Sequence, residues 1–179
     1  MYQALVDFWF SEEVSKHWFN STREFDQQLL AEYGACWQQA KEGELDQWGE
    51  TAIGSLALVI LLDQIPLNIF RGKPDSFSTE AQSILVARAA IDRGFDTDLT
   101  TPQKSFLYMP FMHSENRQNQ VLALGLFDQP GLEANLRFSK HHHDIVERFG
   151  RFPHRNEILE RESSQAEIEY LNSKQAFKG

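Results

Sequence analysis

Apolar residues recur along most of this chain at the three- and four-residue spacing of a helix face. The segment 22–41 shows the pattern in full. Its apolar face consists of Phe25, Leu29, Tyr33, Cys36, Trp37 and Ala40. Ser21 or Thr22 can cap the start of this helix, and Gly43 ends it. The pattern therefore predicts a long amphipathic helix.

The most apolar part of the chain is residues 51–62, where Leu56 to Leu62 are apolar without interruption. A central buried helix and a buried strand both fit such a run. Helix is favoured, because no second segment could pair with a strand. We expect Pro66 to break this helix. The run is also too short to cross a bilayer.

Helical patterns continue through the rest of the sequence with short Gly and Pro punctuation. Further helices are predicted over residues 2–10, 75–93, 101 to the region of Pro110, 114–127 and 132–149, with a last helix opened by a Ser164–Glu167 capping box. In the 132–149 helix the inward stripe is Asn135, Phe138, His142, Ile145 and Phe149. The prediction is an all-α fold, a single compact domain over residues 1–179 with about eight or nine helices and no strands.

Composition narrows the classes of partner. A net charge of −9 leaves no basic patch for nucleic acid. The one cysteine, Cys36, forms no internal disulfide and is expected to be a small core residue. The first residues lack basic side chains and a long apolar run, so we expect no signal peptide. A cytoplasmic protein without a membrane partner is predicted.

Polar residues interrupt the apolar faces at four places. The first is Asp63, four residues after Val59 on the packed stripe, followed across Pro66 by Asn68 and Arg71. The favoured interpretation is structural: Asp63 pairs with an arginine and ties the Pro66 turn to the core.

The second place is His113-Ser114-Glu115, which follows Pro110. His113 and Glu115 can converge only if the segment is kinked or not helical. Ser114 lacks a nucleophile elbow, so the indication of a hydrolase is weak.

The third place is His141-His142-His143. Successive helical side chains diverge by about 100°, so only His142 is expected to face inward. With one cysteine and no pair of histidines at metal-binding spacing, neither a bound metal nor a cofactor is predicted.

The fourth place is the segment 148–156, which combines three arginines, a histidine and an asparagine with two phenylalanines. Its arginines suit carboxylate or phosphate. Two interpretations stay open: they neutralise Asp63, Glu115 and backbone carbonyls, or they line an anion-binding pocket with histidines. The candidate ligand-binding residues are Arg151, His154, Arg155, Asn156, Asp63 and Arg71, and the candidate catalytic residues are His113, Glu115, His142 and Asp63.

Four motifs together resemble the bacterial DUF924 family. They are Asp7-Phe8-Trp9-Phe10, the segment 61–71 around Asp63-Gln64-Ile65-Pro66, the segment 106–115 around Pro110-Phe111-Met112-His113, and Phe149-Gly150-Arg151-Phe152-Pro153-His154-Arg155-Asn156. The resemblance covers nearly the whole chain and implies stacked antiparallel helix pairs, similar to TPR-like superhelices. It supplies no reaction, since the family is of unknown function. The family pattern usually has arginine where this chain has Leu67, and glycine where it has Glu160.

Three functional hypotheses follow. The leading one is a binding module whose Arg/His pocket takes a small anionic ligand or an acidic peptide. The second is a metal-independent hydrolase with a His–carboxylate pair in that pocket. The third is a purely structural or interaction protein. The pocket in the first two hypotheses rests on one prediction, that Asp63, His113, Glu115, Arg151 and His154 are neighbours in space.

Overall fold

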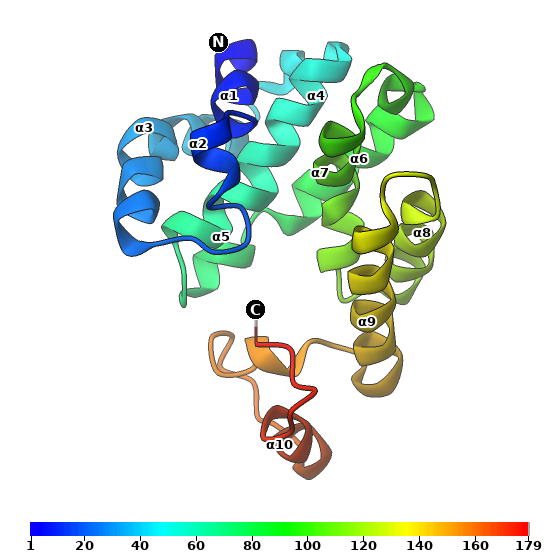
Figure 1. Cartoon of the computed structure of the whole chain (residues 1–179). Coiled ribbons are helices and arrows are strands. Elements are labelled where there is room, and N and C mark those ends of the chain that lie inside the picture. Colours follow the sequence, from blue (N-terminus) through cyan, green and yellow to red (C-terminus); the bar gives the residue numbers. More distant parts are fainter. Residues whose placement is uncertain (179) are drawn as a thin grey trace. The chain divides into compact units, whose positions relative to one another are not determined.

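A computed structural model describes residues 1–178, and all regular secondary structure in that range is helical (Figure 1). The all-α prediction is therefore confirmed. The chain divides into two compact units: Met1–Arg71 with Asp75–Pro110, and Gly72–Pro74 with the residues from Phe111 onward.

The first unit is built around its most apolar helix. Its helices are α1 (Tyr2–Trp9), α2 (Glu12–Ser15), α3 (Arg23–Lys41), α4 (Ala52–Val59), α5 (Ile65–Ile69), α6 (Glu80–Asp92) and all but the last turn of α7 (Thr101–His113). Both α1 and α6 pack on α4, and α3 packs on α5. Helix α4 is buried on every side from Gly54 to Val59, as expected for a segment without charged residues. The helix prediction for this run is confirmed.

Capping residues define the start of the longer helix α3. The side chain of Thr22 accepts a hydrogen bond from the backbone N–H of Phe25, as predicted. Four members of the predicted α3 stripe are buried: Phe25, Leu29, Trp37 and Ala40. The short helix α2 was not predicted, because four residues are too few to show a helical period. Its N-cap is Ser11.

Pro66 does not break the central helix, contrary to the sequence prediction. The chain passes from α4 through a π-helical segment, Ile60–Gln64, directly into α5, which has Pro66 in its first turn. A proline cannot donate to the carbonyl four residues earlier, here that of Leu62. The hydroxyl of Thr79 donates to this carbonyl instead, at 2.6 Å, and lies 3.4 Å from Nε1 of Trp37. The missing hydrogen bond is thus replaced by a tertiary one.

The combined stretch Ala52–Ile69 is the one helical span in the described chain that is long and apolar enough to cross a membrane. Of this stretch, 72% is buried inside the protein. Core helices of soluble proteins share this combination, so the span is weak evidence for a membrane location.

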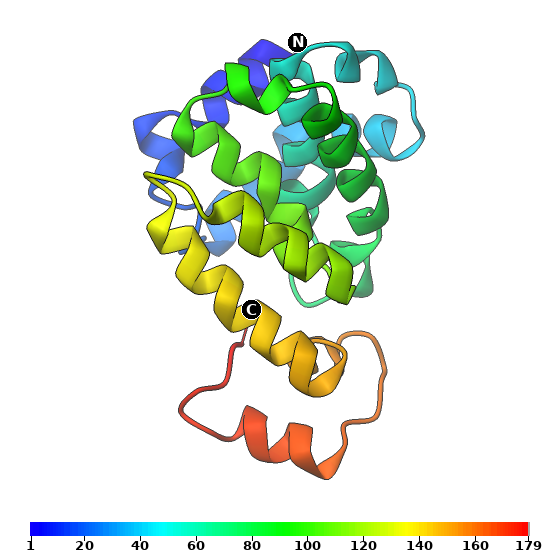
Figure 2. The same ribbon diagram turned by 90° about the vertical axis from the view of Figure 1, so that its right-hand side faces the viewer.

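The second unit contains the end of α7 followed by α8 (Arg117–Phe127), α9 (Glu133–Phe149), a 3₁₀ turn (Pro153–Arg155) and α10 (Gln165–Leu171). Helices α8 and α9 lie side by side (Figure 2). Helix α8 begins three residues later than predicted, because the side chain of Asn116 accepts from the N–H groups of Gln118 and Asn119. The predicted capping box of α10 is confirmed.

The predicted inward stripe of α9 is only partly correct. His142 and Ile145 are buried, but Phe138 is 59% exposed. The buried positions of α9 are Ser139, His142, Ile145 and Val146. Small Ser139 therefore occupies the place that the apolar pattern assigned to Phe138.

Candidate functional site

The basic segment is placed by the end of α9. Gly150 has a φ of 72°, a left-handed conformation that ends the helix as predicted. The chain then turns so that Phe152 is fully buried, and Pro153 opens the 3₁₀ turn that carries His154 and Arg155. The buried ring of Phe152 thus fixes the loop after α9 to the second unit, with polar residues on either side of it in the sequence.

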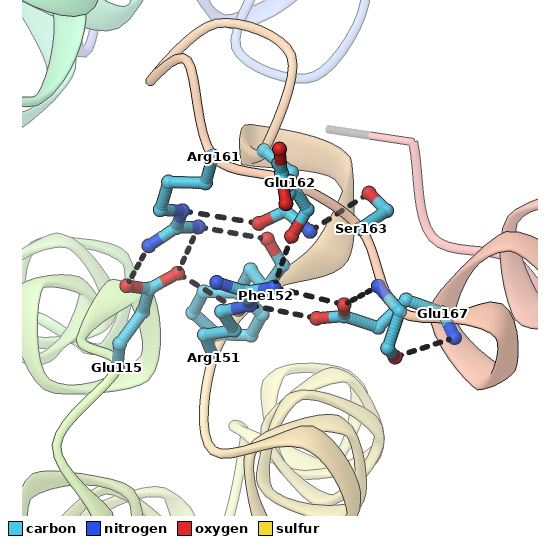
Figure 3. Close-up of polar contacts among 9 residues, drawn as sticks. Glu115, Arg151, Phe152, Arg161, Glu162, Ser163 and Glu167 are labelled. Atoms are coloured by element: carbon cyan, nitrogen blue, oxygen red, sulfur yellow. Dashed lines mark hydrogen bonds and ion pairs between the residues drawn. The ribbon is translucent and has the colours of Figure 1, made fainter.

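Arg151 is held by a carboxylate outside its own segment. Its Nε and Nη2 donate to the two oxygens of Glu167 at 2.7 and 2.9 Å, and Nη2 also donates to the carbonyl of Glu162 at 2.7 Å (Figure 3). Glu167 is the third residue of α10 and also accepts from the backbone N–H of Ser164. The hydrogen bonds from Arg151 are the main cause that lowers the pKa of Glu167 to about 2.

Glu115 forms a second ion pair, with Arg161 (Figure 3). Nη1 and Nη2 of Arg161 donate to its oxygens at 2.7 and 2.9 Å, and the N–H of Phe152 donates to Oε1 at 2.8 Å. Burial alone would raise the pKa of Glu115, but these hydrogen bonds outweigh it and hold the pKa below the ordinary value. Arg161 also donates to Oδ1 of Asn156, whose amide donates to Ser163.

Arg155 is the most buried of these arginines, with 6% of the residue exposed. Its Nη2 donates to the carbonyl of His113 at 2.6 Å, and its guanidinium lies 4.8 Å from the ring centre of Phe152. Its charge also helps to lower the pKa of Glu115. Arg155 therefore brings the end of α7 and the 3₁₀ turn together.

His142 is buried and neutral at physiological pH. Its Nδ1 lies 2.8 Å from the carbonyl of Phe138, and a carbonyl can only accept, so Nδ1 carries the proton. Burial is the main cause that lowers the pKa of His142 to about 3, with smaller contributions from neighbouring His113, His141 and His154 and against the opposing effect of this hydrogen bond.

His154 has a similar character but a different surrounding. Burial and the charge of Arg155 lower its pKa to about 4, against the opposing effect of Glu115, while Arg161 and His113 add to the lowering. The Nδ1 atom is shielded from solvent and has no hydrogen-bond partner among the described residues.

These contacts decide how far the predicted site residues come together. Seven of them, His113, Glu115, His142, Arg151, His154, Arg155 and Asn156, belong to the second unit and are linked by the contacts above. Asp63 and Arg71 belong to the first unit. Buried Asp63 accepts from Gln64 at 2.6 Å, and Arg71 bonds to Asp26 and Asn68. The convergence of Asp63 with the basic segment stays a prediction.

Sequence reasoning missed two residues that hold the site together, Arg161 and Glu167. The capping box marked Glu167 as a helix-start residue, but nothing in the sequence connected it with Arg151. Arg161 lies after Glu160, which has a positive φ of 53°. That turn directs the chain back toward Glu115. The pairing of Arg161 with Glu115 therefore depends on the turn, which the sequence did not predict.

Among the residues that the structure describes, no three His, Cys, Asp or Glu side chains are grouped so that they could hold a metal ion. The absence of a metal in the protein itself stays a prediction, which elemental analysis of untagged protein tests.

The comparisons with known proteins agree with the motifs. Residues 5–175 match the family model described as "Bacterial protein of unknown function (DUF924)". The chain belongs to the DUF924 family. This DUF924 protein is similar to a solved structure of a protein of unknown function, ATU0120 from Agrobacterium tumefaciens, with 39% identity over 96% of both chains and a TM-score of 0.91. A search of curated proteins gave no match.

Proposed function

We propose that this DUF924 protein is a cytoplasmic binding module that takes a small anionic ligand or the acidic end of a peptide. The binding surface is formed by His142, His154 and Arg155 in the second unit. The observation that carries the proposal is the shielded Nδ1 of His154, which lacks a hydrogen-bond partner in the described chain and stands beside the charge of Arg155.

The electrostatics favour an anion at this place. Half-buried His154 stays neutral next to the buried guanidinium of Arg155, whose charge changes the pKa of His154 more than the opposing charge of Glu115 does, so an incoming negative charge meets a positive local potential. A shielded polar atom without a partner costs about 1–3 kcal/mol. An anion that accepts a hydrogen bond from protonated His154 would remove this cost and raise the pKa of the imidazole.

Arg151, Asn156 and Arg161 have a supporting role in this proposal. Arg151 and Arg161 each bond to both oxygens of one carboxylate, and Asn156 links Arg161 to Ser163. Charge-assisted bidentate pairs of this kind fix geometry. They hold the loop that presents His154 and Arg155.

A thermal-shift titration tests the proposal, with inorganic phosphate and succinate as probes at constant ionic strength. A ligand at one hundred times its Kd stabilises a protein by about 2.7 kcal/mol, which corresponds to roughly 5–10 °C in a chain of this length. We expect such a rise for the wild type. In His154→Phe, which keeps the aromatic ring, the rise should be lost.

His143→Gln is the matched control, because His143 is partly exposed and faces Asp144 rather than this surface. It should respond like the wild type. The proposal fails if neither anion raises the melting temperature, or if His154→Phe responds as strongly as the control.

A further inference from the structure

The segment that follows α10 places an aromatic side chain among the histidines. The ring centre of Phe177 lies 4.5 Å from that of His142 and 4.9 Å from that of His154, with interplanar angles of 61° and 85°. The ring centre of His141 lies 6.3 Å from that of Phe177. Edge-to-face geometry of this kind is the favoured packing of aromatic rings. We call these three histidines the Phe177 seat.

The backbone at Phe177 is recognised as well. Its N–H donates to the hydroxyl of Tyr170 at 2.9 Å. The other described backbone hydrogen bonds of residues 175 and 176 go to Ser173, within the same segment. The segment is therefore attached to the unit through one ring and one N–H, while Lys174, Gln175 and Lys178 are exposed.

A side chain in an aromatic seat and a main-chain N–H on a fixed acceptor together form a two-point contact of the kind that binds peptides. His154 is one of the three histidines of the seat, so the occupant of the seat lies against the imidazole on which the proposed binding function depends. Any ligand of His154 must therefore share the seat with Phe177 or displace it.

We infer that the Phe177 seat is a recognition site for an aromatic side chain of a peptide ligand, and that Phe177 is its displaceable occupant in the unliganded protein. This inference rests on the proposed binding function and specifies the ligand: a peptide with an aromatic residue a short distance before its C-terminal carboxylate. Tyr170 accepts the main-chain N–H of that residue, and the acidic group reaches His154 and Arg155.

Competition with Phe177 sets the expected affinities. A tethered occupant acts at an effective concentration in roughly the millimolar range. A free peptide therefore binds the wild-type protein weakly, and removal of the Phe177 ring should strengthen binding by roughly tenfold or more.

The experiment uses the full chain with Phe177→Ala and a synthetic peptide, Ser-Lys-Gln-Ala-Phe-Lys-Gly, which copies residues 173–179. Imidazole C–H signals of His142 and His154 in NMR spectra report binding. We expect saturable shifts of both signals in Phe177→Ala and much weaker binding in the wild type. The same peptide with alanine in place of phenylalanine is the control and should not bind.

Two further variants keep the test decisive. Tyr170→Phe in the Phe177→Ala background removes the acceptor and should weaken the peptide severalfold. If Phe177→Ala does not fold, Phe177→Leu keeps an apolar side chain and should bind the peptide with intermediate affinity. The inference is overturned if a folded Phe177→Ala or Phe177→Leu protein does not bind the peptide.

The phosphate and succinate titration separates the two proposals. Peptide binding without an anion response would support the Phe177 seat as a recognition site and refute the anion site. An anion response that depends on His154, without peptide binding to Phe177→Ala, would refute the seat alone.

Discussion

Glu160 is in an unusual conformation for its residue type. Its φ of 53° is the one positive value at a non-glycine position in the described chain. A side chain in the left-handed region costs about 1–2 kcal/mol, because Cβ approaches the carbonyl oxygen. The DUF924 pattern resembled by this chain usually has glycine here. Glu160 therefore adopts a backbone conformation that glycine would adopt with less strain.

Glu160→Gly should therefore stabilise the protein. The relief of strain is partly offset by the larger entropy of an unfolded glycine, so we expect a gain of about 0.5–1 kcal/mol. Chemical denaturation measures it. Glu157→Gly, at an exposed position without positive φ, should lose stability, and Glu160→Ala should gain little. Equal effects of glycine at 157 and 160 would refute the strain argument.

Arg161 is a test of the ion-pair framework. Arg161→Met leaves the partly buried carboxylate of Glu115 without its bidentate partner, whose side chain is 24% exposed. Breaking a fully buried pair costs about 3–5 kcal/mol, and partial solvation reduces this to roughly 2–3 kcal/mol. Urea denaturation should show this loss.

The exposed pair of Arg117 and Glu147, 3.5 Å apart, supplies the control. Arg117→Met should cost less than about 1 kcal/mol, because surface pairs contribute little. A similar loss in both variants would mean that the Glu115 pair does not stabilise the unit more than a surface pair.

At the scale of elements, local signals in the sequence predicted the helices well where a residue caps or ends its own helix. Thr22, Gly150 and Ser164 all act at the predicted positions. The predicted helix break at Pro66 was wrong, because a tertiary hydrogen bond replaces the one that proline cannot make. Its donor, Thr79, lies thirteen residues further on and belongs to another segment. Helix periodicity alone cannot reveal such a hydrogen bond.

Thr79→Val tests this replacement. The variant keeps the shape but leaves the carbonyl of Leu62 and the indole N–H of Trp37 without this partner. A buried group that loses its partner costs about 1–3 kcal/mol. The control is Thr97→Val, since the hydroxyl of Thr97 donates to Gly94 at an exposed turn. If both variants lose equally little, the hydroxyl of Thr79 is not what allows Pro66 in the helix.

The candidate site shows the same division between local and distant information. The inward direction of His142 followed from helix spacing, and the polar character of segment 148–156 was plain in the sequence. Which charge pairs with which was not predictable, because Arg151 could equally have met Asp63 or Glu115. It meets Glu167, which a different helix positions.

At the scale of the whole molecule, buried His142 and half-buried His154 make stability depend on pH. Unfolded histidine has a pKa near 6.5, whereas the folded pKa values of His142 and His154 are about 3 and about 4. Between these values the unfolded chain binds more protons than the folded one, so stability rises with pH. The contribution is complete above about pH 7 and is lost as pH falls from 6.5 towards 4.

Below pH 4.5 the carboxylate of Glu167 adds to the loss. Its pKa falls from the ordinary value of 4.5 to about 2 in the folded protein, so the unfolded chain again binds more protons as pH falls through that window. Histidine and carboxylate therefore act in sequence, the histidines first.

Urea denaturation between pH 8 and pH 4 should thus show a plateau above pH 7 and a steady decline below 6.5. In a His142→Phe, His154→Phe double variant the decline between pH 6.5 and 5 should flatten, because both imidazoles with a lowered pKa are gone while the aromatic packing on Phe177 is kept. His143→Gln should leave the profile unchanged, since its ring is partly exposed. A double variant as acid-sensitive as the wild type would show that other groups control stability in this range.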